Sequence, residues 1–386
     1  MGYDFEVAVI GGGPAGSSAA RRLAEAGVSV VLFEKQAMPR RKVCGGALSE
    51  QAMSYLDFDL PQDVVDWECY GARVTYGDKT LVERLDERIA VLVTRSKFDK
   101  LLVDIAQEAG AQLVWEAVAS LDEGEHGVIV KTASGASFTV RRCIICAGAN
   151  SRFISKVRPR DGIDGEGICM EGEVDRLSPD PFAHLEGLID IYFGVAGYGY
   201  GWVFHHGTYY SVGVGGLRAK FPHPARALQE FTAQIGLTGK LRDVKGHPIP
   251  RGGLERRLGK GNLLLAGDAA GFVDPFYGEG LAYAIRSGQL AAEAMVGNPQ
   301  ADSMHQDYRR TTKAEFSANL EYSLLFSKVM YTFPKLFLNT LVSDEKALQR
   351  YLYVPLNKLS YKQYLLWLVP RLPVFWARRL FELLLP

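Results

Sequence analysis

Three glycines and one carboxylate near the start of the chain have the types and the spacing to hold a dinucleotide. Gly11, Gly13 and Gly16 form a GxGxxG pattern, and Glu34 follows 18 residues after the last glycine. The first glycine permits a tight turn, the second lets the backbone approach a pyrophosphate, and the third lets a helix pack closely on a strand. The Glu34 carboxylate is placed to accept hydrogen bonds from ribose hydroxyls. We therefore predict a dinucleotide site that includes Ala15, rather than a glycine-rich turn of an unrelated α/β protein.

Later segments predict that the dinucleotide is FAD. Asp268 in "LLLAGDAAG" lies at the end of a predicted strand, where its carboxylate can hold a ribityl hydroxyl, a group that only a flavin cofactor has. Asp268 by itself could also be a helix N-cap. Gly278 and Gly280 then begin a further helix, whose first amides would face the edge of the flavin that becomes negative on reduction. Two further positions are expected at the cofactor, Arg95 at a helix start and Gly148 in the turn of "ICAGANS".

A single cysteine, Cys44, lies between basic residues and two glycines in the stretch "RRKVCGGAL". A thiol beside a flavin could supply a proton during the reduction of a double bond. It could equally be a small hydrophobic side chain in a turn. Cys143 and Cys146 form a CxxC pattern, but they lie in an apolar run typical of a strand, and we interpret them as core thiols.

Hydrophobic patterning indicates the elements that would position these residues. A strand, a helix and a second strand open the chain and predict a parallel sheet. The later segments predict a mostly antiparallel sheet and then helices that are broken by prolines. The predicted elements are strands over 5–10 and 28–34, helices over 14–27 and 96–110, strands within 111–148, an antiparallel sheet within 155–250, a buried strand in 262–271, a helix over 280–295, and helices from 304 onward.

The predicted fold class is α/β, a Rossmann-like FAD-binding domain with an inserted antiparallel β-sheet substrate domain and a C-terminal helical region. The proposed FAD-binding domain is discontinuous. Its segments are 1–70, 90–155 and 256–300, the substrate domain takes 71–89 and 156–255, and the helical region takes 301–386. The motif "VGVGG" at 212–216 lacks a strand–turn–helix frame, so a nicotinamide donor would bind without a Rossmann domain of its own.

The glycine, Glu34 and Asp268 segments together resemble the FAD-binding monooxygenases and reductases that share the fold of para-hydroxybenzoate hydroxylase. The stretch around Cys44 resembles the geranylgeranyl reductase family, whose Lys-x-Cys-Gly-Gly segment is matched by Lys42, Cys44, Gly45 and Gly46. The family's cysteine lies by the flavin ring. This resemblance completes the predicted cofactor-binding set, which is Gly11, Gly13, Ala15, Gly16, Glu34, Lys35, Arg41, Cys44, Gly45, Arg95, Gly148, Asp268, Gly278, Gly280 and Leu281.

The same family carries a Pro-x-x-Tyr-x-Trp-x-Phe-Pro motif that lines the pocket over the flavin. In "GYGYGWVFHH", Tyr200, Trp202 and Phe204 match this motif, whereas Gly197 and His205 replace its two prolines. The resemblance implies Cys44, Tyr200 and Trp202 as catalytic residues, with Cys44 a proton donor, a relay or a pocket wall. It implies Tyr200, Trp202, Phe204 and His206 as substrate-binding residues, and His206 and Tyr200 are alternative proton donors. Alternating core aromatic residues of a sheet would give the same pattern.

The activity that the resemblance implies is FAD-dependent saturation of geranylgeranyl chains on a lipid, a diphosphate, a quinone or a chlorophyll precursor. NADPH or another low-potential donor, such as a ferredoxin, would supply the electrons. Two alternatives stay open: a flavin monooxygenase or halogenase, and a prenyl-lipid carrier without enzymatic activity. The match of "YGWVFH" to the Trp-x-Trp-x-Ile-Pro motif of halogenases is poor, and the complete glycine, Glu34 and Asp268 set argues against a carrier.

Charge and hydropathy bear on partners and location. The 44 basic and 44 acidic residues balance, which gives no indication of nucleic-acid binding, and no metal site is expected. Residues 328–386 carry nine basic and three acidic residues, and the segment 364–386 interleaves arginines with apolar and aromatic residues. This segment predicts either peripheral contact with a membrane or packing on the protein's own tunnel wall. Because the first strand begins near Phe5 and no long apolar run follows, we expect a cytoplasmic protein that rests on a membrane surface at most.

Overall fold

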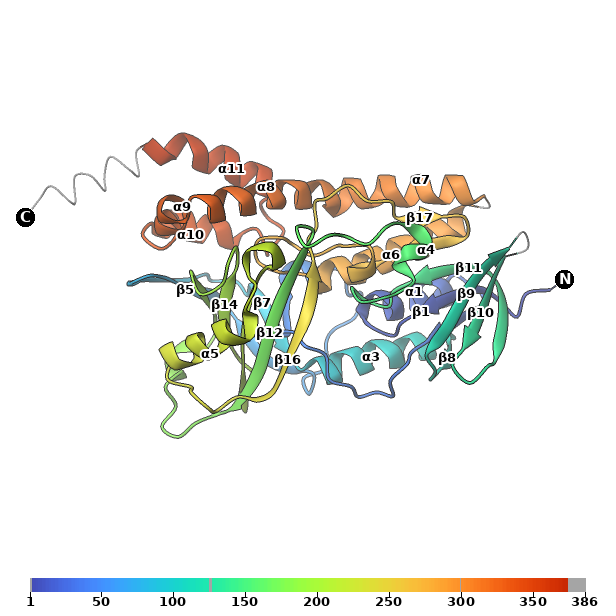
Figure 1. Ribbon diagram of the computed structural model, residues 1–386, viewed down its shortest axis with the longest axis horizontal. Helices are drawn as coiled ribbons and strands as arrows, with labels where there is room; N and C mark the ends of the chain where they lie inside the picture. The colour runs from blue at the N-terminus through green and yellow to red at the C-terminus, as the bar shows by residue number, and fades with distance from the viewer. Residues whose placement is uncertain (1, 125–126, 299, 374–386) are drawn as a thin grey trace, which may run out of the picture.

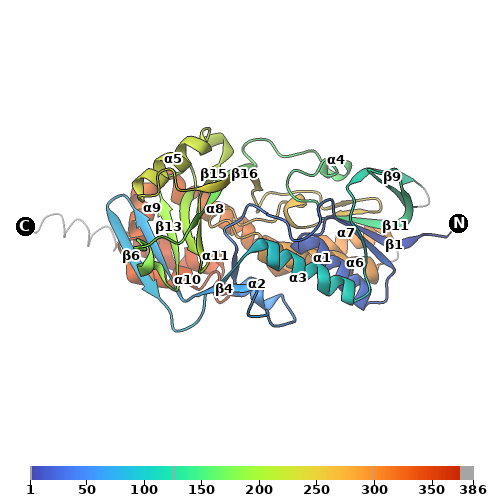
Figure 2. The same ribbon diagram turned by 90° about the horizontal axis from the view of Figure 1, so that it is seen from below.

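The structure is a computed structural model that describes residues 2–124, 127–298 and 300–373. Figure 1 shows two sheet-containing halves side by side, with the N-terminus in one half and the last helices over the other. The helices after residue 300 lie along one side of both halves (Figure 1). Figure 2, the view from below, shows α1 and α3 against the sheet of the N-terminal half.

The sheet of the N-terminal half is built on parallel strands. β1 pairs in parallel with β2 and β11, β2 with β8, and β11 with β18. The order β17-β18-β11-β1-β2-β8 places the two ends of this half, which are far apart in sequence, in one sheet, and β9 and β10 extend it from β11. Its strands are β1 (Phe5–Ile10), β2 (Val30–Phe33), β8 (Gln112–Val114), β9 (Val118–Gly124), β10 (Gly127–Thr132), β11 (Ser137–Ile145), β17 (Gly259–Lys260) and β18 (Leu263–Leu265).

The second sheet has seven strands in the order β16-β12-β15-β14-β13-β5-β6. All its neighbouring strands are antiparallel except β13 and β5, which pair in parallel. Successive residues of a strand face opposite sides, so alternate positions of each strand line one face of this sheet. Its strands are β5 (Gly71–Tyr76), β6 (Lys79–Arg84), β12 (Glu166–Asp175), β13 (Leu188–Phe193), β14 (Tyr200–His205), β15 (Tyr209–Leu217) and β16 (Arg242–Pro250).

A small antiparallel sheet and a set of helices complete the described fold. The small sheet has the order β3-β7-β4, with β3 (Ala47–Ser49), β4 (Val65–Cys69) and β7 (Ala90–Val93). The helices are α1 (Pro14–Glu25), α2 (Glu50–Ser54), α3 (Arg95–Glu108), α4 (Ile154–Val157), α5 (Pro224–Gln234), α6 (Leu281–Gly297), α7 (Ala301–Thr312), α8 (Ala318–Thr332), α9 (Pro334–Leu341), α10 (Glu345–Leu352) and α11 (Tyr361–Leu368). The helices predicted over 14–27, 96–110 and 280–295 are confirmed as α1, α3 and α6.

The C-terminal helices pack on one another and on the second sheet through aromatic residues, and the ring of Tyr331 of α8 lies 6.2 Å from that of Phe193 of β13. Phe326 of α8 is fully buried, and its ring lies 4.6 Å from that of Phe276, 5.4 Å from that of Tyr361 and 5.5 Å from that of Tyr364. Such edge and tilted ring pairs add to the free energy gained by burying apolar surface. Within the described residues no helix is long and apolar enough to span a membrane. The tail residues 374–386, on which part of the membrane-contact prediction falls, lie outside the described residues.

Candidate functional site

The turn between β1 and α1 leaves backbone groups free for a ligand. Gly11 has a φ of +105°, and a Cβ there would lie 2.6 Å from the carbonyl oxygen of Cys146. A Cβ on Gly16 would lie 1.8 Å from the carbonyl oxygen of Gly11, so helix and turn meet at that point. Gly13 is the N-cap of α1 and provides no side chain to bond the first amides, and Pro14 follows at the first helical position. The positive end of α1 is therefore available to a phosphate.

Glu34 is held in place by the same turn. Its Oε2 accepts a hydrogen bond from the backbone N–H of Gly12 at 2.8 Å, and its Oε1 accepts one from Gln36 at 3.0 Å. The side chain is 5% exposed and lines a cavity together with the glycines of the turn. A carboxylate positioned at the end of β2 in this way can bind hydroxyls of a ribose, as the sequence predicts.

This cavity has a volume of about 850 Å³ and reaches from the glycine turn to the C-terminal helices. A volume of several hundred Å³ is typical of sites for cofactors and small ligands. Of the predicted site residues, the structure brings all except Gly16 and His206 to its walls. Those that line it are Gly11, Gly13, Ala15, Glu34, Lys35, Arg41, Cys44, Gly45, Arg95, Gly148, Tyr200, Trp202, Phe204, Asp268, Gly278, Gly280 and Leu281.

Asp268 and the start of α6 line the same cavity as the cysteine loop. Lys42 is half-buried near Asp268; burial lowers the pKa of its ammonium, and the carboxylate of Asp268 opposes this effect. Gly278 has a φ of +76°, and Gly280 is the N-cap of α6, without a side chain to bond the first amides. The glycine turn at one end of the cavity fits the pyrophosphate of FAD. The uncapped start of α6, with Asp268 nearby, fits the ribityl chain and the flavin ring.

Cys44 is the one cysteine that is not buried, and all five cysteines lie in the described residues. Its Sγ accepts a hydrogen bond from the backbone N–H of Gly46 at 3.4 Å. The guanidinium of Arg95 bonds Asp99 at 2.8 and 3.0 Å; burial opposes its charge, but Asp99 and Cys44 together raise its pKa. Cys143 is buried in β11, and Cys146, also buried, follows the strand at the cavity wall, so both thiols lie in the core as interpreted.

Aromatic side chains of β14 form one wall of the apolar part of the cavity. Tyr200, Trp202 and Phe204 alternate along β14 and all line the cavity. The hydroxyl of Tyr200 donates a hydrogen bond to the backbone carbonyl of Tyr277, and burial raises its pKa, so the phenol stays protonated. Neighbouring strands supply further apolar wall residues, which are Ala72, Val74, Ile189, Ile191 and Phe193.

His206 lies behind this wall instead of lining the cavity. Its Nδ1 is 2.9 Å from Oδ2 of Asp66, and its Nε2 is 3.0 Å from the carbonyl oxygen of Gly45. A Cβ on Gly46 would lie 2.9 Å from the His206 ring, so the imidazole packs directly under the Gly-Gly pair. The structure gives His206 a supporting position under the cysteine loop, and its part in substrate binding stays a prediction.

Sequence reasoning missed the far wall, which the C-terminal helices provide. Leu341 of α9 and Leu348, Tyr351 and Leu352 of α10 line the cavity opposite the sheet. Their spacing is that of any amphipathic helix, so only their distance in space from the glycine turn identifies them as part of a site. His247 of β16 was also missed; burial and then Lys42 lower its pKa to about 4.

Asp274 ties the loop before α6 to the C-terminal helices. Its Oδ1 accepts hydrogen bonds from the backbone N–H groups of Phe276 and Tyr277 and from the hydroxyls of Ser323 and Tyr361, at 2.8 to 3.2 Å. Its Oδ2 makes no hydrogen bond to the described residues, and burial raises the pKa of the carboxyl to about 6.

We expect the Asp274→Asn variant to gain stability relative to the wild-type protein as pH rises. The pKa of Asp274 in the folded protein lies above its ordinary value of 3.8, so the folded state binds the proton more tightly. The carboxyl therefore contributes most stability below pH 4, and that contribution is lost as pH rises toward 6. The difference in unfolding free energy should change by about 2–3 kcal/mol between pH 4 and 7, measured by urea unfolding. Equal differences at both pH values, with exposed Asp59→Asn as control, would contradict this.

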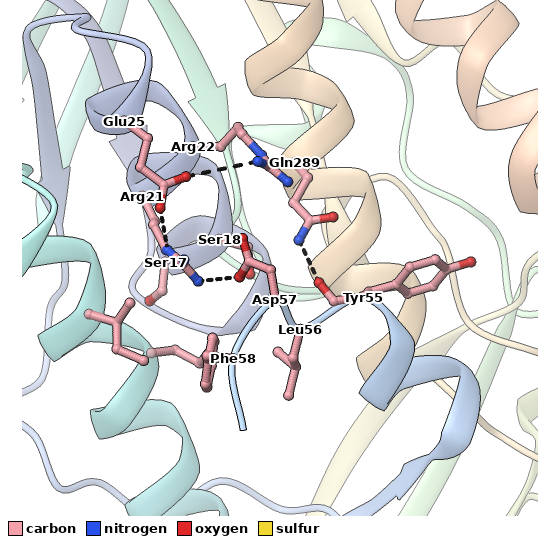
Figure 3. Close-up of a pocket in the computed structure, with 12 residues that line it drawn as sticks. Ser17, Ser18, Arg21, Arg22, Glu25, Tyr55, Leu56, Asp57, Phe58 and Gln289 are labelled. Atoms are coloured by element: carbon pink, nitrogen blue, oxygen red, sulfur yellow. Dashed lines mark hydrogen bonds and ion pairs between the residues drawn. The ribbon is translucent and has the colours of Figure 1, made fainter. Parts of the chain in front are cut away.

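A second pocket, between α1, α3 and α6, is too small for a ligand. Its volume is about 20 Å³, room for a single water molecule. Figure 3 shows Arg21 bridging Glu25 and Asp57, at 2.7 and 2.5 Å, and the side-chain amide of Gln289 donating to the carbonyl of Tyr55. These bonds join the helices and the loop after α2, which is a structural role.

Comparisons with known proteins agree with this geometry. Residues 4–172 match the family described as FAD binding domain. The chain is 31% identical over 317 residues to the chloroplastic geranylgeranyl diphosphate reductase of Arabidopsis thaliana, covering 77% of this chain and 66% of that protein. It is 30% identical to the digeranylgeranylglycerophospholipid reductase of Methanocella arvoryzae, covering 77% and 78%. A solved geranylgeranyl bacteriochlorophyll reductase-like protein from Thermoplasma acidophilum has the same fold, with a TM-score of 0.78, 24% identity and coverage of 88% and 91%.

Proposed function

Because this chain belongs to the geranylgeranyl reductase family of FAD-dependent oxidoreductases, we propose that it saturates carbon–carbon double bonds of polyprenyl chains. The substrate would carry its chain on a lipid, a diphosphate, a quinone or a chlorophyll precursor. The observation that carries the proposal is the single cavity that joins the dinucleotide cradle to an apolar chamber between β14 and α10. Each methylene that a prenyl chain buries there would contribute about 0.8 kcal/mol.

The residues that line the cavity would contact successive parts of FAD, from the pyrophosphate to the flavin ring. Gly11, Gly13 and Ala15 would surround the pyrophosphate, and Glu34 would bind the adenosine ribose. Lys35, Arg41, Arg95 and Gly148 would line the adenosine and phosphate region, and Asp268 would hold the ribityl chain. Gly45, Gly278, Gly280 and Leu281 would border the ring. When bound, the reduced cofactor supplies a hydride to one carbon of the double bond. The chain must deliver a proton to the other carbon.

We propose Cys44 as the first candidate for this proton transfer. Of the alternatives, the Tyr200 hydroxyl already donates to the Tyr277 carbonyl, and His206 is buried under the cysteine loop. Cys44 is partly exposed and lines the cavity on the side that carries Trp202. It would act as the donor, as a relay, or as a wall that excludes water. Trp202 and Phe204 would hold the isoprene unit against the ring.

The electron donor and the membrane contact are finer parts of the proposal. The stretch 212–216 lies within β15 of the antiparallel sheet, so NADPH or a ferredoxin would reach the flavin without a second Rossmann unit.

Exposed apolar side chains of the C-terminal helices favour peripheral contact of a cytoplasmic protein with a membrane. They are Phe333 at 56%, Leu366 at 67% and Val369 at 54% exposed.

The test is incubation of the FAD-loaded protein and dithionite with geranylgeranyl diphosphate and with a geranylgeranylated ether lipid, with and without vesicles. We expect mass spectrometry to show products that gain two hydrogens for each double bond reduced, with vesicles improving turnover of the lipid. If every prenyl substrate remains unchanged, the assignment is wrong. Oxygen-dependent formation of a hydroxylated or halogenated product would instead assign a monooxygenase or halogenase activity.

A further inference from the structure

A buried carboxylate lies directly behind the cavity wall. Glu171 is on β12, two positions after Cys169, which lines the cavity, so both side chains face the same side of the second sheet. Glu171 is 3% exposed and does not itself line the cavity. A carboxylate in such a place is costly unless its neighbours bond it, so those neighbours indicate what it does.

One oxygen of Glu171 is linked to the aromatic wall. The indole Nε1 of Trp202 donates to the hydroxyl oxygen of Ser211 at 3.1 Å, and that hydroxyl donates in turn to Oε1 of Glu171 at 3.5 Å. The chain of bonds runs from β14 through β15 to β12, across three neighbouring strands. Because an indole has a single N–H, this bond fixes the rotation of the Trp202 ring.

The other side of Glu171 holds the cysteine loop. Arg41 Nη2 lies 3.5 Å from Oε2 of Glu171, and Arg41 Nε lies 3.4 Å from Oε1 of Glu173. The same guanidinium donates to the backbone carbonyl of Asp243. The backbone of Cys44 also faces the Glu171 carboxyl and lowers its pKa. Arg41 and Cys44 are three residues apart, so Glu171 anchors the loop at two points.

We propose that Glu171 is a positioning residue that holds the thiol of Cys44 and the ring of Trp202 in one fixed arrangement at the flavin. The roles of those two side chains in turnover rest on the function proposed above. The arrangement itself does not, because it follows from contacts within the protein. No other described carboxylate is in contact with both the cysteine loop and, through Ser211, the aromatic wall.

The charge on Glu171 depends on its surroundings. Burial raises its pKa to about 7, and Arg41 opposes this. The other charged or titratable groups that face it are Glu173 and Cys169 on β12, Tyr209 on β15, Lys245 opposite on β16, and the Cys44 loop. The anion, present above pH 7, is the form that pairs with Arg41. The interaction of Glu171 with the cysteine loop should therefore weaken as pH falls below 7.

The first test measures the reactivity of Cys44 with monobromobimane in the purified protein, with and without FAD. Cys44 is the partly exposed thiol, and peptide mapping separates it from the four buried ones. We expect Glu171→Gln to raise its labelling rate about tenfold, because a charged hydrogen bond and an ion pair to the loop are lost. Glu173→Gln is the matched control: it removes the neighbouring carboxylate, which also contacts Arg41 but does not face the Cys44 backbone, and should raise the labelling rate far less than Glu171→Gln does. Labelling of Glu171→Gln at the wild-type rate would overturn the proposal.

The second test separates the two links by kinetics of prenyl reduction. Glu171→Gln should lower kcat about tenfold and abolish the fall of kcat below pH 7 that we expect for the wild type. Ser211→Ala should raise KM while leaving Cys44 labelling unchanged, because it cuts only the bond to Trp202. An unchanged pH profile in Glu171→Gln would contradict the inference. If the wild-type protein reduces no prenyl substrate, the proposed function fails, and the labelling result still decides the role of Glu171.

Discussion

Replacing Gly16 with alanine is expected to give a protein that purifies without FAD and does not take it up. An added Cβ would lie 1.8 Å from the carbonyl oxygen of Gly11 and 3.2 Å from Cβ of Cys146. Both neighbours belong to the buried junction of sheet and helix, so they have no room to move aside. The start of α1 would have to shift away from β1, and its amides would leave the position in which they meet the pyrophosphate. Flavin content, measured from the absorbance spectrum after reconstitution, checks this.

Gly297 offers a matched control for the Gly16 substitution. It is also a helical glycine, at the end of α6, and a Cβ there would meet nothing within 4 Å. We expect Gly297→Ala to bind FAD as the wild type does, with unchanged or slightly higher stability, because alanine favours a helix over glycine. A yellow Gly16→Ala protein with full flavin content would contradict the proposed role of the turn.

Replacing Cys44 with alanine is expected to leave FAD bound but to lower the rate of prenyl reduction about 100-fold. This loss corresponds to the lower end of what a positioned proton donor contributes. The side chain accepts a hydrogen bond from the backbone N–H of Gly46 and faces the Arg95 side chain, which Asp99 also holds, so its removal should disturb the loop little. The measurement is single-turnover reduction of a prenyl substrate by the reduced protein, with KM determined separately.

The Cys44→Ser variant distinguishes the three roles that Cys44 could have. A hydroxyl can pass on a proton within a relay but is a much weaker acid than a thiol. A direct donor would therefore be lost in both variants, a relay would recover part of its rate in Cys44→Ser, and a wall would change KM more than kcat. A Cys44→Ala protein with the wild-type rate and KM would exclude all three roles.

Much of the dinucleotide half could be predicted because its signals are local. The turn from Gly11 to Gly16 and the helices over 14–27, 96–110 and 280–295 depend on short-range patterns, and the structure confirms these elements. The antiparallel sheet within 155–250 was predicted from alternation and is confirmed as β12 to β16. The domain boundaries and the roles of the cofactor residues remain predictions.

The parts that could not be predicted depend on contacts between distant segments. Nothing near Leu348 or Tyr351 indicates that α10 faces β14, because apolar helix positions look alike whichever surface they cover. His206 has a residue type suited to catalysis, but its ring is turned to Asp66 and the Gly45 carbonyl. In the sequence, Glu171 is one of several acidic residues of a strand, and nothing there indicates that its side chain is buried behind Trp202.

The chamber between β14 and α10 has two walls that come from separate stretches of the gene, one before residue 205 and one after residue 340. Mutations that enlarge or shrink side chains on the later stretch would alter how long a chain fits without touching the dinucleotide cradle. Selection for a new lipid could thus act on the last helices alone. Grafting these helices between relatives is a direct route to altered chain-length preference with the redox half conserved.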